Sequence, residues 1–286
     1  MQADAQALRL NGTVQTYERG GVRIHTYISP EDGLLTNTPI IEGPDSLIIF
    51  DGQFFLPHAR EAGAYAATLD KPVERIILSH IHLDHWSGLG ILADQFPGAP
   101  VCSLGGVVDY LRKHAQGILD ARRTAFGERI PLHPTIPGVV MAEGRTTIGG
   151  VKFEFMRFVD AESAVQLVAI MPDQGVMLAF DLAFAPYEHV FTVTPHFGNW
   201  VRILDLLEAS SFDVVVSGHG SITDRSALHA TADYLRTGAE IYARAKGPAE
   251  YAERMKTTFP DRSHQGWIDL SASLLYSVID AYDTSN

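Results

Sequence analysis

The sequence predicts an α/β fold in which two β-sheets pack face to face and helices cover their outer faces. Strand-like and helix-like segments alternate through both halves of the 286 residues, and this alternation favours sheets layered with helices. A hydrophobic content of 46% with 20% charged residues is typical of a soluble globular chain. No linker rich in Pro, Gly or Ser divides the sequence, and the length suits one large domain or two ordinary ones.

The expected strands are short apolar runs bounded by turn residues. In chain order they cover 22–28, 38–41, 47–50, 76–78, 101–104, 147–148, 151–157, 164–171, 176–180 and 214–216. Helical patterns fall between them at 58–69, 86–95, 107–115 and 201–209. From 113 to 144 the pattern breaks at a group of prolines, and we expect an insertion or lid there.

The last part of the chain predicts a helical extension. Apolar residues recur at steps of four and three from Leu228 to Tyr242, which gives one apolar helix face. We expect Gly247-Pro248 to end this helix, and a second helical pattern runs from Trp267 to Tyr282. We therefore expect a main domain over 1–224 and an extension over 225–286, packed on that domain or on the partner of a homodimer.

Charge and composition exclude several classes of partner. A net charge of −12 argues against binding a nucleic-acid backbone, and no apolar run approaches the roughly 18 residues of a membrane span. The N-terminus lacks the basic region and apolar core of a signal peptide, which favours the cytoplasm; the periplasm fits if a signal peptide was removed. The single cysteine, Cys102, is expected to be a buried strand residue.

The most informative segment follows the predicted strand 76–78. It contains His80, His82, Asp84 and His85 within six residues, and imidazole nitrogens and carboxylate oxygens suit zinc, iron or manganese. His80 and His82 lie two apart in an extended segment and project to the same side, whereas Asp84 and His85 fall where a helix begins. This grouping predicts two adjacent metal positions.

The motif His80-x-His82-x-Asp84-His85 resembles the signature of the metallo-β-lactamase superfamily of hydrolases. The resemblance runs from about residue 23 to about residue 223, and it implies that superfamily's four-layer αββα sandwich. It also implies that Asp181, after the strand 176–180, bridges the two metals. The first site would then use His80, His82 and a third ligand, and the second would use Asp84, His85 and His219.

The third ligand departs from the common pattern of the superfamily. Most members have a His ten residues before the Pro that ends the following strand; here that Pro is Pro172, and Glu162 stands in place of the His. A similar Glu occurs in the alkylsulfatase-like branch. A carboxylate ligates zinc as an imidazole does, and it makes iron or manganese more plausible. Asp160 is the reserve candidate, and Phe180 replaces a Gly that usually precedes the bridging aspartate.

The resemblance implies a dinuclear metal-dependent hydrolase, with zinc as the first expectation. Asp84 would also be catalytic, since it can orient the attacking water or pass its proton to the leaving group. The segment 184–200 is rich in aromatics, which favours an ester, lactone or amide bond, β-lactams included, in an apolar or aromatic small molecule. The candidate substrate contacts are Phe184, His189, His196 and Trp200.

Two alternatives stay open at this stage. A sulfate-ester hydrolase is favoured by Glu162. A di-iron redox protein of the flavodiiron type belongs to another class, and the identity of the metal separates it from a zinc hydrolase.

Overall fold

The computed structural model describes residues 8–277 and contains the two predicted sheets. The seven-stranded sheet has the order β1-β2-β3-β4-β5-β6-β7. Its strands are β1 (Thr13–Arg19), β2 (Val22–Ile28), β3 (Asn37–Glu42), β4 (Leu47–Phe50), β5 (Val73–Ile77), β6 (Val101–Leu104) and β7 (Val139–Met141). Strands β1 to β4 pair antiparallel, whereas β4 to β7 pair parallel, as helical crossovers between them require.

The six-stranded sheet has the order β13-β12-β11-β10-β9-β8. Its strands are β8 (Gly144–Ile148), β9 (Val151–Val159), β10 (Val165–Met171), β11 (Val176–Phe180), β12 (Val214–Ser217) and β13 (Thr223–Asp224). All neighbours pair antiparallel except β11 and β12, which are parallel. Each sheet therefore contains parallel neighbouring strands. The carboxyl ends of such strands lie at one edge, which is where α/β proteins place their sites.

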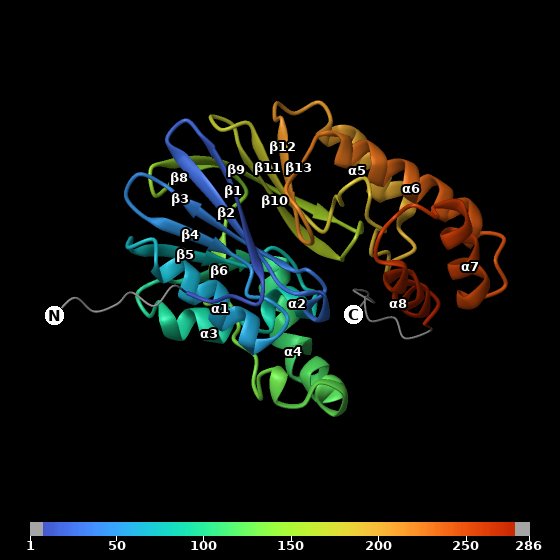
Figure 1. Cartoon of the computed structure of the whole chain (residues 1–286), viewed down its shortest axis with the longest axis horizontal. Helices are drawn as coiled ribbons and strands as arrows, with labels where there is room; N and C mark the ends of the chain where they lie inside the picture. The colour runs from blue at the N-terminus through green and yellow to red at the C-terminus, as the bar shows by residue number, and fades with distance from the viewer. Residues whose placement is uncertain (1–7, 278–286) are drawn as a thin grey trace.

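Helices cover both outer faces, so the molecule has four layers (Figure 1). On the outer side of the seven-stranded sheet lie α1 (Leu56–Ala67), α2 (Leu83–Trp86), α3 (Leu89–Gln95) and α4 (Gly105–Phe126). On the other side lie α5 (Phe197–Leu207), α6 (Ser226–Tyr242), α7 (Pro248–Thr258) and α8 (Gln265–Leu275). This arrangement confirms the predicted αββα sandwich with helices at its C-terminal end.

Aromatic side chains join the two sheets in the interior. Phe50 of β4 packs against Phe153 of β9 and Phe180 of β11, with ring centroids 6.1 and 5.7 Å apart. All three are at most 1% exposed, so apolar burial between the sheets holds them together. A second apolar core lies between the six-stranded sheet and α5 to α8.

The C-terminal helices pack on the main body of the chain. Leu228, Ala232 and Leu235 of α6 are buried in the same core as Val215 of β12, so the apolar face predicted from the sequence docks within the chain. The boundary at 224/225 and a homodimer remain predictions. None of the helices in 8–277 has the length and apolar character needed to cross a membrane.

Several elements differ from the expectation. Helix α4 continues to Phe126 and buries Ala115 and Leu119, so half of the expected lid is core-packed helix. Pro248 does not only follow a helix end; it opens α7, where its missing N–H is not needed. Strands β1, β7 and β13 were not predicted, because β1 and β13 are largely polar and β7 is an apolar run of only three residues. Val278 and Tyr282, expected in the last helix, lie outside the described residues.

Candidate metal centre

The candidate ligands come from four loops where the two sheets meet. The segment 79–85 follows β5, Glu162 lies between β9 and β10, Asp181 follows β11, and His219 follows β12. Backbone hydrogen bonds join the sheets at this edge: Leu167 N donates to Ser79 O at 2.9 Å, and Asn37 N donates to Gly218 O at 2.8 Å. The fold therefore brings residues 140 positions apart to one place.

The side chains form two groups that share Asp181. The first contains His80, His82, Glu162 and Asp181, and the second contains Asp84, His85, Asp181 and His219. Within each group the potential ligand atoms lie within 4.8 Å of one another. These are the seven residues that the sequence predicted as ligands. Asp160, the reserve candidate, is exposed and belongs to neither group.

Asp181 lies between the two groups at short range. Its Oδ1 is 3.2 Å from His85 Nε2, and its Oδ2 is 3.1 Å from His219 Nε2 and 3.7 Å from His80 Nε2. In the first group, Glu162 Oε1 is 2.8 Å from His82 Nδ1. Asp181 therefore faces histidines of both groups, which is the position of a bridging ligand.

Burial and hydrogen bonding fit a pair of cations. The side chains of His85, Glu162 and Asp181 are at most 2% exposed. Among the described residues, both oxygens of Glu162, Asp181 Oδ1 and His85 Nε2 have no hydrogen-bond partner outside the cluster; within it, Glu162 pairs with His82 and Asp181 with His85. Buried charged groups without partners are costly unless they are paired or coordinate metals, and this donor set of imidazoles and carboxylates suits zinc, iron or manganese.

Outer hydrogen bonds orient the histidines of this cluster. The Asp51 carboxylate accepts hydrogen bonds from Ser79 N and Ser79 Oγ at 2.8 Å and from His85 Nδ1 at 2.9 Å. Ser79 Oγ in turn lies 2.8 Å from His80 Nδ1. These bonds occupy the Nδ1 atoms and leave the Nε2 atoms toward the cluster, as outer partners of metal ligands do. Asp51 was not singled out in the sequence, so this role was missed.

His219 and Asp84 are held from the early loop 30–36. His219 Nδ1 donates to Leu34 O at 2.8 Å, and Leu34 adopts a left-handed conformation with φ of 64°. Thr36 Oγ1 lies 3.5 Å from Asp84 Oδ2. This early loop therefore orients a candidate ligand.

The electrostatics of the cluster shift the pKa values of Asp181 and Glu162 in opposite directions. Burial raises the pKa of Asp181, but the neighbouring His85 and His219 outweigh it and hold the pKa well below its usual range. Burial also raises the pKa of Glu162 and dominates there, so that the pKa is about 7 despite the nearby His82. Glu162 is therefore the weaker acid of the two carboxylates.

The conformation of Phe180 explains the departure noted in the sequence. This residue precedes Asp181 with φ of 49°, in the left-handed region that favours glycine. The pairing of β11 with β12 also shifts register there. Phe180 fills the space between the sheets against Phe50, which offsets the conformational cost of a bulky residue at this turn.

The predicted substrate contacts occupy different environments. Phe184 stacks on the His219 ring with centroids 5.9 Å apart and an interplanar angle of 8°. His189 is buried in a network, with Nδ1 at 3.1 Å from Tyr234 Oη and Nε2 at 3.0 Å from Gln265 Nε2. Trp200 lies fully in the core, and the carbonyl of His196 accepts a hydrogen bond from its backbone N–H. The structure thus brings Phe184 to the cluster and gives Trp200 and His189 contacts within the scaffold.

One aromatic residue beside the cluster was not singled out in the sequence. Trp267 of α8 has its ring centroid 5.5 Å from that of His219, and His264 stacks on it at 4.5 Å. In the sequence, Trp267 is one position of an amphipathic helical pattern, which core packing explains equally well. No local signal distinguishes it.

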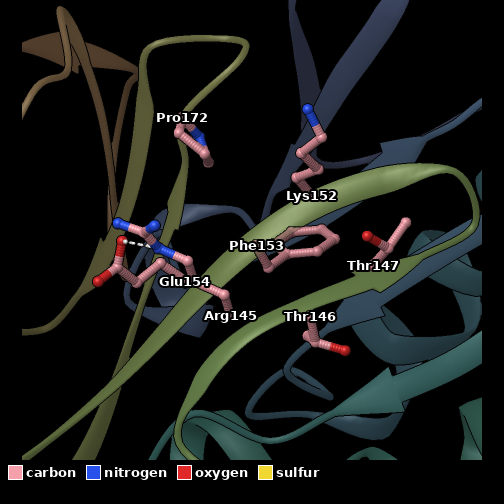
Figure 2. Close-up of a pocket in the computed structure, with 7 residues that line it drawn as sticks. All are labelled: Arg145, Thr146, Thr147, Lys152, Phe153, Glu154 and Pro172. Carbon is pink, nitrogen blue, oxygen red and sulfur yellow. Dashed lines mark hydrogen bonds and ion pairs between the residues drawn. The ribbon is translucent and has the colours of Figure 1, made fainter.

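A shallow hollow of about 380 Å³ lies elsewhere, on the hairpin of β8 and β9 (Figure 2). Its charged residues are paired: Arg145 with Glu154 at 3.4 Å, and Lys152 with Asp173 at 3.0 Å. None of the residues that line it belongs to the two ligand groups. The chemistry of the cluster therefore identifies the site better than the shape of this surface.

Solved structures with the same fold include metallo-β-lactamases. The enzyme from Pontibacter korlensis is 18% identical, covers 78% of this chain and 99% of its own, and has a TM-score of 0.61. FIM-1 from Pseudomonas aeruginosa, in a mono-zinc form, is 16% identical, covers 82% of this chain and 99% of its own, and has a TM-score of 0.56. The sec-alkyl sulfatase PisA1 is 18% identical and covers 96% of this chain and 52% of its own, with a TM-score of 0.64.

Two curated relatives are named as alkylsulfatases, and both are longer proteins than this chain. The alkyl/aryl-sulfatase BDS1 of Saccharomyces cerevisiae is 27% identical over 229 residues, which is 65% of this chain and 34% of that protein. The linear primary-alkylsulfatase of a Pseudomonas species is 25% identical over 216 residues, or 63% and 40%. The chain thus spans well under half the length of the curated relatives it matches, and it is distantly homologous to them.

The family model of the metallo-beta-lactamase superfamily matches residues 32–219. This range contains all seven candidate ligands and Asp51, together with most of the strands and helices that position them. The chain therefore belongs to the metallo-beta-lactamase superfamily, and its His/Asp cluster is intact.

Proposed function

We propose that the chain hydrolyses ester bonds of small organic molecules with an apolar body, and that sulfate monoesters are its substrate class. The observation that carries this proposal is Glu162, a fully buried carboxylate in the first ligand group where most members of the superfamily have a histidine. Solved and curated relatives named as alkylsulfatases support the same assignment.

The proposed reaction depends on metal ions that the two ligand groups would hold. His80, His82, Glu162 and Asp181 would hold one divalent ion, zinc by preference over iron or manganese, and Asp84, His85, Asp181 and His219 would hold a second. Such ions, when bound, supply Lewis acidity and lower the pKa of a bound water toward neutrality.

Asp84 is the residue that we assign to proton transfer. Its side chain is 16% exposed, whereas those of Asp181 and Glu162 are 2% and 0% exposed. Asp84 is thus the carboxylate of the cluster that faces the open side, where the substrate and the attacking water arrive. From there it can orient the water, accept its proton and return that proton to the leaving oxygen.

Carboxylic esters, lactones and amides, including β-lactams, are the second candidate class. The aromatic wall of Phe184 and Trp267 beside His219 accepts an apolar acyl group as well as an apolar alcohol. Two arginines have other partners: Arg129 pairs with Asp32, and Arg262 donates to the carbonyls of Glu188 and Ala230. In this proposal the bound metal ions would supply the positive charge that the sulfate needs.

The test is a substrate panel on zinc-loaded protein: an alkyl sulfate, an aryl sulfate, p-nitrophenyl butyrate, a γ-lactone and a cephalosporin. We expect release of inorganic sulfate from the sulfates and loss of that activity in Asp84→Asn. Turnover of the carbonyl substrates without release of sulfate would favour the second class. A protein with two metals per chain that converts none of the five would contradict both.

A further inference from the structure

The three tryptophans of the chain differ in what their indole N–H groups contact. Trp86 Nε1 donates to Ile81 O at 2.9 Å, and Trp200 Nε1 donates to Leu182 O at 2.8 Å. Trp267 is 7% exposed, and no side-chain hydrogen bond is made by its indole N–H within residues 8–277. Its Nε1 is not among the fully enclosed polar atoms without a partner, so this N–H is open to solvent and is a spare donor.

The ring that carries this donor lies beside the metal cluster. The Trp267 ring centroid is 5.5 Å from that of His219, at an interplanar angle of 65°, and 6.5 Å from that of Phe184. Phe184 stacks on His219, so two aromatic rings flank one candidate ligand. Trp267 comes from α8, more than forty residues beyond His219, so the helical extension takes part in building the wall of the site.

The structure around Trp267 holds the ring in place. His264 stacks on it with centroids 4.5 Å apart and an interplanar angle of 20°, and Trp267 N donates to His264 O at 2.9 Å. His264 itself has φ of 63°, a conformation that costs energy for a residue other than glycine. Ser263 N donates to Tyr187 O at 2.8 Å and ties this segment to the loop after Asp181.

We infer that Trp267 is a substrate-binding residue that donates its indole N–H to an oxygen of the substrate. The inference rests on the proposed function, since a sulfate or a carbonyl oxygen is the acceptor. A neutral donor fixed in advance binds such an oxygen with little loss of entropy. In this role an oxygen of the substrate replaces solvent as the partner of the indole N–H, and α8 contributes a residue to the wall of the site.

The direct test follows the three indole N–H signals by NMR in the full chain, ¹⁵N-labelled and zinc-loaded, with Trp267→Phe to assign one of them. The probes are 1-octanesulfonate, a non-hydrolysable analogue of an alkyl sulfate, and octanoate, the acid released from a carboxylic ester. We expect one of them to shift the Trp267 signal downfield and to leave the signals of Trp86 and Trp200 in place. A Trp267 signal unmoved by either probe overturns the inference.

Kinetics provide the second readout. Trp267→Phe keeps an aromatic ring and removes the donor, so KM should rise about fivefold to tenfold, as for one lost hydrogen bond, with kcat within about twofold of wild type. The matched control is Tyr276→Phe at the opposite end of α8, which removes a hydroxyl that bonds Tyr242 O and should leave KM unchanged.

The two proposals fail in different ways. Wild-type KM in Trp267→Phe, measured on a substrate that the chain does hydrolyse, overturns the role of Trp267 and leaves the proposed function standing. A Trp267 signal that shifts with a probe, in a protein that converts none of the five panel substrates, supports the role of Trp267 and contradicts the proposed function.

Discussion

The two ligand groups share Asp181 but differ in what holds their side chains in place. In the second group, His85 is bonded to Asp51, His219 is bonded to the carbonyl of Leu34, and Asp84 lies near the Thr36 hydroxyl. In the first group, His80 contacts Ser79. Among the described residues, Glu162 has no hydrogen-bond partner outside the cluster, and its oxygens lie near His82 and His80.

This difference indicates how each group is organised. Outer hydrogen bonds fix the direction of a ligand and raise its affinity for a metal, so the second group is oriented by the protein itself. Glu162, whose pKa burial raises to about 7, depends on a cation to favour its charged form. We therefore expect the second group to be the tighter metal position and the first to be the one that a single substitution empties.

The largest expected effect is on turnover, from Asp84→Asn in the second group. The amide keeps the shape of the side chain but cannot accept a proton, so kcat should fall by at least about a hundredfold. Steady-state kinetics on the substrate identified in the panel measure this. Full turnover in a variant that still contains two metals would contradict the role of Asp84.

A large effect on stability is expected from His189, behind the second group. Burial lowers its pKa to about 4, against about 6.5 when unfolded. The folded state therefore binds fewer protons than the unfolded state between these values, and stability present above pH 6.5 is lost as the pH falls to 4. The loss should reach about 2–3 kcal/mol.

His189→Gln should flatten this loss, and urea denaturation at pH 7, 5.5 and 4.5 compares the two proteins. Because the ring of His189 contacts Tyr234 and Gln265, KM should stay at the wild-type value. An unchanged pH dependence together with a raised KM would instead place His189 at the substrate.

Asp51→Asn tests whether outer support makes the second group the tighter one. An amide cannot accept all three hydrogen bonds that the carboxylate accepts, and loss of such support costs about tenfold to a hundredfold in metal affinity. Chelator competition measures the metal affinity. The control is Glu42→Gln, which removes a carboxylate of β3 that pairs with His25 and Lys71. Equal metal affinities in the two variants would contradict the role of Asp51 in supporting the ligands.

The smallest expected effect compares two tryptophans. Trp200→Phe leaves the buried carbonyl of Leu182 without its donor, which should lower the free energy of unfolding by about 1–3 kcal/mol. Trp267→Phe loses no hydrogen bond within the described chain, so its cost should be smaller. Denaturant midpoints rank the two variants, and a larger loss in Trp267→Phe would contradict the assignment of its N–H to the substrate.

The sequence predicted the parts of this molecule that local chemistry specifies. The ligands from 79–85 are dense and follow an apolar run, and the spacing between Glu162, Pro172 and Asp181, compared with the pattern of the superfamily, predicted Glu162 as the third ligand. Strands such as β4, β6 and β11 were predicted with their observed bounds, because each is a short apolar run between turn residues.

The parts that the sequence did not reveal depend on contacts between distant residues. The role of Asp51 requires the end of β4 to lie beside the end of β5, and Trp267 reaches His219 only because α8 packs there. Helix α7 lacked a strong pattern, with a charged composition that also suits a loop. Tertiary packing decided these cases, and no single segment contained the information.

The most direct measurement is the metal content of protein purified without added metal, by elemental mass spectrometry, for wild type, Glu162→Ala and Asp160→Ala. Asp160 is the matched control, an exposed carboxylate two residues from Glu162. We predict two metal ions per chain in wild type and in Asp160→Ala, and about one in Glu162→Ala. Two ions in Glu162→Ala would contradict the assignment of Glu162 as a ligand, and fewer than two in wild type would contradict the dinuclear centre.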